Sequence, residues 1–177
     1  MTRALTKPVW LRVSPAIRSF ILGEVERQYH PIGTAAYAER VEWMTDAWQW
    51  AMENDHGDPP TVEDILHVAA MIEPVLNANG FRWGPVWIGG KQAPIAEAVP
   101  QMVRELWEEI GGVIPEEGRR SPGSGQPMTA DNFYLEFEHI HPFYDGNGRT
   151  GKLLHNWLLG RLDRPVLVRD YFGGGNP

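Results

Sequence analysis

The sequence predicts one all-α domain, a helical bundle with a single β-hairpin inserted between two of its helices. Its 177 residues suit one domain with a sizeable core, and 42% hydrophobic with 22% charged residues is typical of a globular protein. Apolar residues recur every three or four positions along most of the chain, which indicates helices. Only residues 81–100 have the composition of a hairpin.

Three helices are predicted in the first half of the chain. Ser14 and Pro15 suit the N-cap and first turn of a helix that runs to Tyr29. A second helix spans residues 34–54, and a capping box at residues 61–64 opens the third. The buried face of the third helix is predicted to be Ile65, Val68, Ala69, Ile72, Val75 and Leu76.

The hairpin and the helix after it come next. Val86–Ile88 and Gln92–Ile95 flank a Gly-Gly turn, which is the pattern of two short antiparallel strands. A helix follows over residues 101–110. Residues 111–127 are rich in Gly, Pro and Ser, so we expect a mobile loop without strands.

Two further helices are predicted, one capped by Thr129 and one that begins near Asn147. Most tryptophans occupy helical positions, so we assign them to the core and not to a ligand cage. These are Trp43, Trp48, Trp50, Trp107 and Trp157. Residues 173–177 are expected to form a frayed tail.

Charge and cysteine content exclude several kinds of protein. A net charge of -7 gives no overall attraction to nucleic acid or to an anionic membrane, so neither is expected as a partner. The absence of cysteine excludes disulfides and thiolate catalysis. No stretch reaches the roughly 18 apolar residues of a membrane span, and the first residues lack a signal-type apolar core. We therefore expect a cytoplasmic protein.

The segment from His141 to Lys152 concentrates the chemistry of a phosphate site between two apolar helices. Gly146 and Gly148 allow positive φ, so successive backbone N–H groups could converge on an anion. The helix that starts near Asn147 would add its positive dipole end. Arg149 and Lys152 add two cations three residues apart, on one face of that helix.

Two more side chains of this segment suggest catalysis. Asp145 is the one acid among these cations, and a carboxylate beside phosphates is a typical Mg²⁺ ligand. His141 lies four residues earlier, and a neutral imidazole there could take a proton from an attacking hydroxyl. Phe143 is expected to pin the loop to the core.

Other interpretations of the segment fit its residues less well. Residues 146–152 fit the start of a P-loop, but Leu153 stands where a P-loop needs Ser or Thr. An EF-hand would need a ligand where Arg149 stands. His139 and His141 lack a third nearby ligand for zinc. A turn-rich loop that only caps two helices would need neither the His nor the two cations.

The segment resembles the signature of the Fic family (filamentation induced by cyclic AMP), H-P-F-x-[D/E]-G-N-G-R-x-x-R. From His141 this chain reads HPFYDGNGRTGK, which departs only at the last position, where Lys152 replaces Arg. The resemblance implies a Fic-type helical core over residues 61–170. Residues 1–60 would be a helical extension packed on it, and residues 171–177 a flexible tail.

The resemblance also implies an activity: transfer of AMP from ATP, with Mg²⁺, to a Ser, Thr or Tyr hydroxyl of a target protein. His141 would be the general base and Asp145 the Mg²⁺ ligand. The nucleotide would be bound by Gly146, Asn147, Gly148, Arg149 and Lys152. Val86, Trp87 and Ile88 belong to the segment that resembles the family's flap, which holds the target by strand addition.

The sequence alone leaves two questions open: how the chain would be inhibited, and whether it has a function other than AMP transfer. Many family members are silenced by a Glu in an [S/T]-x-x-x-E-[G/N] helix, which pairs with the second Arg of the signature. The nearest match here is Glu53, which would pair with Lys152; otherwise a separate antitoxin-like chain could inhibit. Phosphotransfer of the death-on-curing type, or a non-catalytic nucleotide- or partner-binding module, are the alternative functions.

Overall fold

The structure is a computed structural model that describes residues 12–28, 32–110, 119–120 and 127–168. In these ranges it contains six α-helices, a short 3-10 helix and two two-stranded antiparallel sheets. The α-helices are α1 (Pro15–Arg27), α2 (Ala35–Asn54), α3 (Val62–Ile72), α4 (Val99–Ile110), α5 (Ala130–Ile140) and α6 (Asn147–Leu158). The all-α prediction is confirmed. The predicted tail and most of the predicted mobile loop lie outside the described residues.

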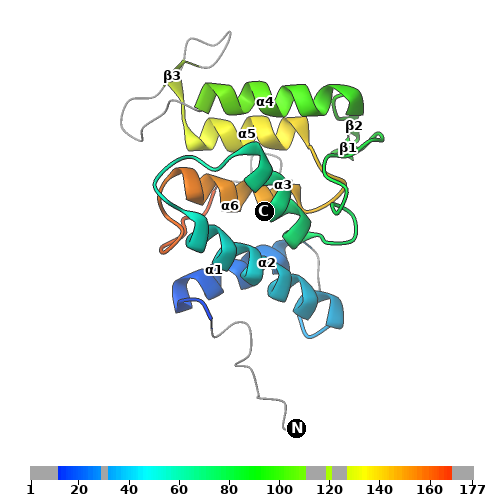
Figure 1. Cartoon of the computed structure of the whole chain (residues 1–177). Helices are drawn as coiled ribbons and strands as arrows, with labels where there is room; N and C mark the ends of the chain where they lie inside the picture. The colour runs from blue at the N-terminus through cyan, green and yellow to red at the C-terminus, as the bar shows by residue number, and fades with distance from the viewer. Residues whose placement is uncertain (1–11, 29–31, 111–118, 121–126, 169–177) are drawn as a thin grey trace, which may run out of the picture.

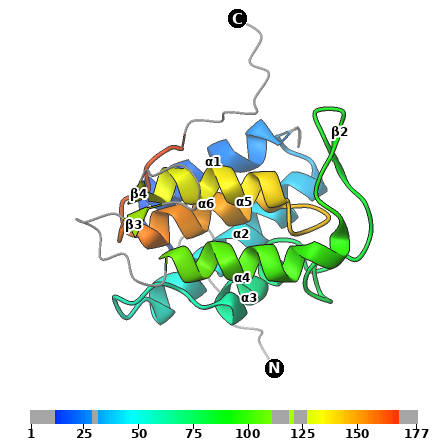
Figure 2. The same cartoon turned by 90° about the horizontal axis from the view of Figure 1, so that it is seen from above.

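The helices form a bundle with α6 at its centre. Figure 1 shows α4 and α5 side by side at one end, α1 and α2 at the other, and α3 and α6 between them. Helix α6 contacts α5, α3 and α2, and Figure 2 shows it enclosed when the bundle is seen from above. Ten of its twelve residues are buried, including several polar ones. The helix that begins at the signature segment is therefore the core of the fold.

The predicted hairpin is confirmed, with shorter strands. Strand β1 (Trp87–Ile88) pairs with β2 (Lys91–Gln92), so that Trp87 faces Gln92 across the ladder. The hairpin stands beside the α4–α5 end of the bundle in Figure 1. The 3-10 helix η2 (Ala96–Ala98) then leads into α4.

Helix starts agree with the predicted caps. Thr61 accepts from the backbone N–H of Asp64 while the Asp64 carboxylate accepts from the backbone N–H of Thr61, which is the predicted capping box. Ser14 and Thr129 cap α1 and α5 through their hydroxyl oxygens. These helix starts depend on contacts within four residues, which the sequence alone can reveal.

Two expectations about the elements were wrong. Helix α3 ends at Ile72, because the residue before a proline is disfavoured in helical geometry and Pro74 follows Glu73. Val75 and Leu76 are therefore exposed instead of buried. The segment predicted to be a loop without strands contains β3 (Arg119–Arg120) and β4 (Pro127–Met128), which pair with each other.

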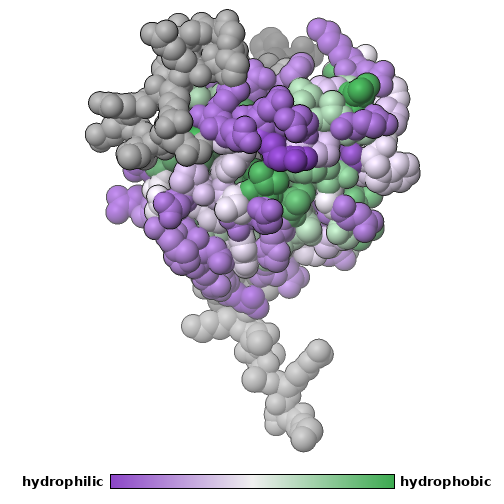
Figure 3. All heavy atoms as spheres, turned by 45° about the horizontal axis from the view of Figure 1, so that its top comes forward, coloured by the Kyte–Doolittle hydropathy of each residue, from purple (hydrophilic) through white to green (hydrophobic). Residues whose placement is uncertain are grey.

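The surface and core divide as expected for a bundle. Trp48 and Trp157 are buried in the core, and the half-buried Trp50 and Trp107 pack against it, as predicted. Trp43 is half-buried, and the Arg40 guanidinium lies 5.8 Å from the centre of its ring. The face shown in Figure 3 is mostly hydrophilic, with small hydrophobic patches. None of the helices in the described ranges has the length and apolar character that a membrane span requires.

Candidate active site

His141 is the C-cap of α5 and has an unusual backbone conformation. Its φ of 50° and ψ of 63° are left-handed, and among the described residues it is the only non-glycine with a positive φ. This conformation costs about 1–2 kcal/mol for an L-residue. Its backbone N–H still donates to Phe137 O at 2.9 Å, which closes the helix. The left-handed turn ends α5 at the histidine that begins the signature segment.

The imidazole of His141 is oriented by a backbone carbonyl. Its Nδ1 lies 3.4 Å from Glu138 O. Because a carbonyl only accepts, this contact requires the hydrogen on Nδ1 and leaves Nε2 as the basic nitrogen of the neutral ring. Burial lowers the pKa of His141 below 6.5, and the charge of Arg82 lowers it further, while the Glu138 hydrogen bond and Asp145 oppose the shift. The ring is therefore neutral at neutral pH, as a general base must be.

Arg82 joins the base of the hairpin to the signature segment. Its guanidinium donates to His141 O at 2.7 Å, to Ile140 O at 3.3 Å, to Gly84 O at 3.0 Å and to Pro94 O at 2.6 Å. Its backbone N–H also donates to the carbonyl of the proline after His141. The side chain is buried, and burial lowers the pKa of its guanidinium from the usual value. Arg82 thus connects the residue segments before β1 and after β2 to the backbone of the candidate base.

The side chain of Asn147 stabilises the loop between α5 and α6. Its Oδ1 accepts from Phe143 N at 2.9 Å and its Nδ2 donates to Phe143 O at 2.9 Å. Phe143 is fully buried and stacks on Phe81, which confirms its predicted role as a pin. Both functional groups of the amide are therefore engaged, and any part of Asn147 in phosphate binding falls to its backbone N–H.

The start of α6 offers donors to an anion. Gly146 is the N-cap with φ 74°, and its carbonyl oxygen accepts from Thr150 N at 2.8 Å, the i to i+4 bond that opens the helix. Helix geometry leaves the N–H groups of the first turn, at residues 147–149, without intrahelical acceptors. Of the two predicted positive-φ glycines, Gly148 is helical instead. It is small for another reason: an added Cβ would lie 3.0 Å from Gln28 Nε2.

Asp145 stands at the edge of this end of the helix. Its Oδ1 accepts from Gly146 N at 2.6 Å and lies 3.7 Å from Arg149 Nη2, and its side chain is 43% exposed. Within the described ranges, no group of three or more His, Cys, Asp or Glu side chains could hold a metal ion. One partly exposed carboxylate beside N–H groups that could bind phosphate suits Mg²⁺, because this ion takes its other ligands from phosphates and water.

Arg149 is fully buried, contrary to the simple picture of a cation that projects towards phosphate. Its Nη2 donates to Glu73 Oε1 at 2.5 Å and its Nε donates to Gln28 Oε1 at 2.8 Å. Arg40 also reaches Glu73, at 3.3 Å. In the described part of the chain, Nη1 of Arg149 has no hydrogen-bond partner. Arg149 therefore links α6 to the ends of α1 and α3, and its Nη1 amino group is left over.

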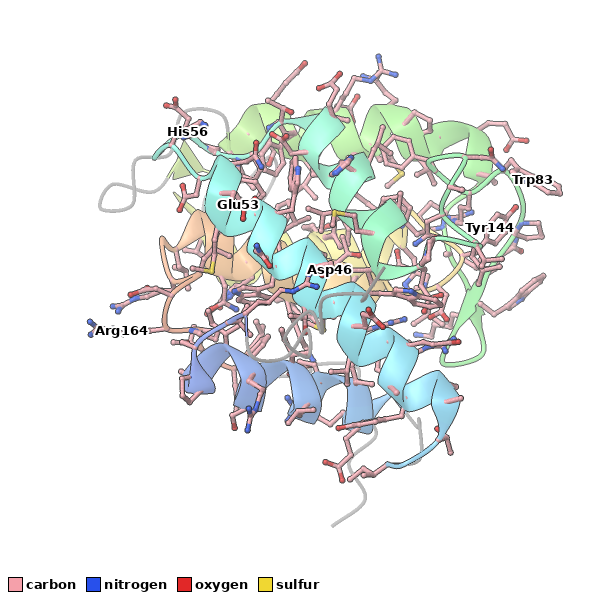
Figure 4. All side chains as sticks on the ribbon, turned by 60° about the horizontal axis from the view of Figure 1, so that its bottom comes forward. Asp46, Glu53, His56, Trp83, Tyr144 and Arg164 are labelled. Carbon is pink, nitrogen blue, oxygen red and sulfur yellow. The ribbon has the colours of Figure 1, made fainter. Side chains whose placement is uncertain are left out.

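Lys152 pairs with an acid that the sequence analysis did not select. Its Nζ lies 2.8 Å from Oε2 of Glu24, on α1, and both side chains are buried. Glu53 is exposed and accepts from Gln49 at 2.8 Å. Figure 4 places Glu53 on α2 far from Tyr144 of the signature segment. The expected Glu53–Lys152 pair is thus corrected: the structure pairs Lys152 with Glu24.

The hairpin residues predicted to hold a target lie beside this site. Trp87 is exposed, while Val86 and Ile88 are half-buried. Ala93 N donates to Val86 O at 3.0 Å, which extends the ladder. Trp83 packs edge-on against Tyr144 at 5.9 Å, and both project together beside the hairpin in Figure 4. Trp83, just before the hairpin, therefore contacts the signature segment directly.

Sequence reasoning missed Glu24, Gln28, Glu73 and Arg82. Glu24 lies on the buried face of α1 with Ile17, Phe20, Ile21 and Val25. An acid in an apolar stripe needs a cation, and that signal could have identified it. Gln28, Glu73 and Arg82 lie at or beyond helix ends, where no periodicity singles them out.

Comparisons with known proteins agree with this geometry. The model of the Fic/DOC family matches residues 91–159, which include β2, α4, α5 and α6. Protein adenylyltransferase Fic of Drosophila yakuba is 31% identical over 117 residues, which are 61% of this chain and 21% of that protein. The ribonucleoside-diphosphate reductase small chain of Ostreid herpesvirus 1 is 28% identical over 125 residues, 63% of this chain and 21% of that protein. The chain thus spans about a fifth of the length of these relatives.

A solved structure shares the fold. The crystal structure of a Fic domain containing signaling protein from Bacteroides thetaiotaomicron superposes with a TM-score of 0.61, over 91% of this chain and 73% of that one. Its sequence identity of 16% supports the fold alone. The helical bundle, the signature segment at the start of α6 and the matched family model agree: they support a Fic/DOC family assignment for this chain, carried by residues 91–159.

Proposed function

We propose that this Fic-domain chain transfers AMP from ATP to a Ser, Thr or Tyr hydroxyl of a target protein. The observation that carries the proposal is the orientation of His141: Nδ1 is held by a carbonyl and Nε2 remains basic. Its lowered pKa keeps it ready to accept a proton at neutral pH. The name of the Drosophila relatives, protein adenylyltransferase, supports this choice of reaction.

In the proposed reaction His141 Nε2 removes the proton of the target hydroxyl. The oxygen then attacks the α-phosphorus of ATP, a new P–O bond forms, and the bond to the leaving pyrophosphate breaks. The first-turn N–H groups of α6 and the dipole of that helix would stabilise the negative charge on the phosphates. Asp145 would hold Mg²⁺, which would neutralise phosphate charge when bound.

The hairpin is the proposed target site. A two-stranded sheet leaves an outer edge of each strand available to an added strand. Arg82 ties this sheet to the backbone of His141, so a segment bound at the edge would have a fixed position relative to the base. The target hydroxyl would be carried on that segment.

Glu24 is the proposed inhibitory residue, in place of Glu53. Its carboxylate neutralises Lys152, the last position of the signature. A cation held in a buried pair is not available to the terminal phosphate of ATP. Loss of the Glu24 carboxylate should therefore raise activity, provided that the protein still folds.

Labelling with two forms of ATP tests the proposal. Wild-type chain, Glu24→Gly and Glu24→Gly/His141→Ala are each incubated with a lysate and with either α- or γ-labelled ATP. The proposal expects protein-bound label from the α form, more of it with Glu24→Gly, and none once His141 is also replaced. Label from the γ form alone would show phosphotransfer instead, and label from neither form would refute both reactions.

A further inference from the structure

The carboxylate of Glu24 is held by two cations, not one. Its Oε2 pairs with Lys152 Nζ at 2.8 Å, and its Oε1 pairs with a guanidinium nitrogen of Arg27. Glu24 is 1% exposed, whereas the Arg27 side chain is 44% exposed. The carboxylate thus lies between a buried ammonium and a guanidinium that reaches in from the surface.

This arrangement is that of an anion site occupied by a side chain. Carboxylate and phosphate oxygens accept the same charge-assisted hydrogen bonds from ammonium and guanidinium groups. Lysine offers a point charge, while arginine offers a planar fork that can bind two phosphate oxygens at once. The last position of the signature segment is Lys152, which has no guanidinium. Arg27, which shares the Glu24 carboxylate with Lys152, has one.

The carboxyl end of α1 lies against the anion-binding end of α6. Gln28, next to Arg27 in the chain, accepts from Arg149 Nε at 2.8 Å. The Nε2 of Gln28 would lie 3.0 Å from a Cβ added at Gly148. Arg27 therefore belongs to the same neighbourhood as the first turn of α6, where unpaired N–H groups favour phosphate.

We propose that Arg27 binds the terminal phosphate of the nucleotide together with Lys152 when the Glu24 carboxylate leaves the space between them. Arg27 would supply the guanidinium that the last position of the signature lacks. The inference rests on the proposed nucleotide binding, and it adds a specificity for triphosphates that comes from α1, outside the segment matched by the family model.

A purely structural role for Arg27 makes a different prediction. Arg27 and Glu24 are three residues apart on one helix, and a cation in the last turn of a helix is favourable by itself. In that case its removal would lower the stability of α1 and would affect all nucleotides equally. Discrimination between nucleotides by phosphate number separates the two roles.

The test measures dissociation constants for ATP, ADP and AMP by calorimetry in Mg²⁺ buffer. Glu24→Ala serves as the background that opens the space, and Arg27→Ala and Arg27→Lys are added to it. Arg18→Ala is the matched control, since Arg18 is an exposed arginine on the same helix. The expected result is roughly a tenfold loss of ATP affinity with Arg27→Ala. Less than a twofold change is expected for AMP, Arg27→Lys should fall between, and Arg18→Ala should have no effect.

An equal change for all three nucleotides, or no change, would overturn the proposal. If Glu24→Ala proves unstable in thermal melts, Glu24→Gln gives a second background for the same Arg27 and Arg18 substitutions, because its amide has no charge to hold the two cations. Binding is measured without transfer, so the ATP-to-AMP affinity ratio decides the role of Arg27 even if no α-label moves to protein. A failure of label transfer with this ratio intact would count only against the proposed reaction.

Discussion

Replacement of Arg82 by alanine should destabilise the protein and disconnect the hairpin from the candidate base. The side chain makes four hydrogen bonds to carbonyls, of which those to His141 O at 2.7 Å and Pro94 O at 2.6 Å are the shortest. Hydrogen bonds from a charged donor are worth about 1.5–3 kcal/mol each. Loss of these two alone gives a destabilisation of roughly 3–6 kcal/mol. For a protein of this size the melting temperature should fall by at least about 6 °C.

The assay combines thermal melts with hydrogen exchange. Exchange at Ala93, whose N–H closes the hairpin ladder, should rise in Arg82→Ala while exchange in α1 and α2 should change much less. Arg104→Ala is the control, because Arg104 is an exposed arginine that makes one hydrogen bond to a backbone carbonyl. Its stability should stay within about 0.5 kcal/mol of wild type. If Arg82→Ala melts within about 2 °C of wild type, the Arg82 hydrogen bonds do not stabilise the protein and this prediction is wrong.

Three further predictions concern the site and its surroundings. The acid limb of the pH–rate profile should lie below pH 6.5, because the base works when neutral and burial lowers the pKa of His141; a limb above 6.5 would contradict this. Gly148→Ala and Gly151→Ala gain the same helix propensity of about 1 kcal/mol, but their thermal shifts should differ in sign. At Gly148 the methyl meets only one atom at the end of a side chain, Gln28 Nε2 at 3.0 Å, whereas at Gly151 it meets the Tyr134 ring at 3.0 Å and the Phe137 ring at 3.1 Å; equal shifts would show that these ring contacts do not determine the sign. Glu24→Gln should lower the free energy of unfolding by about 3–5 kcal/mol in urea titrations, since it leaves a buried lysine without its acid; an unchanged value would mean that the pair contributes nothing.

The sequence predicted those features that depend on neighbours in the chain. The caps at Ser14, Thr61 and Thr129 involve residues three positions apart, so each helix start could be placed to within a residue. The signature segment likewise predicted the start of α6 and the donors around it. The end of α3 was also a local matter, because Pro74 was visible, yet the apolar pattern of Val75 and Leu76 extended the prediction past it.

The rest depends on how the helices pack. Both Glu24 and Glu53 lie on helices before the core, and only the docking of α1 against α6 decides which one reaches Lys152. The Asn147 amide could equally have faced phosphate or backbone, and its contact with Phe143 appears only once the loop has closed. Arg82 is one residue in an irregular segment, and three of its four acceptors lie 12, 58 and 59 residues away along the chain.

The central position of α6 has a consequence for the order in which the protein can assemble during synthesis. At the usual 5–20 residues per second the ribosome takes roughly 7–29 s to pass from the start of α1 to the end of α6, and α6 emerges after every helix that packs on it. Until then the faces of α2, α3 and α5 that pack on α6 have no partner helix. Glu24 and Glu73 likewise lack Lys152 and Arg149, the cations of α6 that pair with them. The nascent bundle therefore lacks its central helix until α6 has been made, and the same helix that carries the proposed phosphate site completes the bundle.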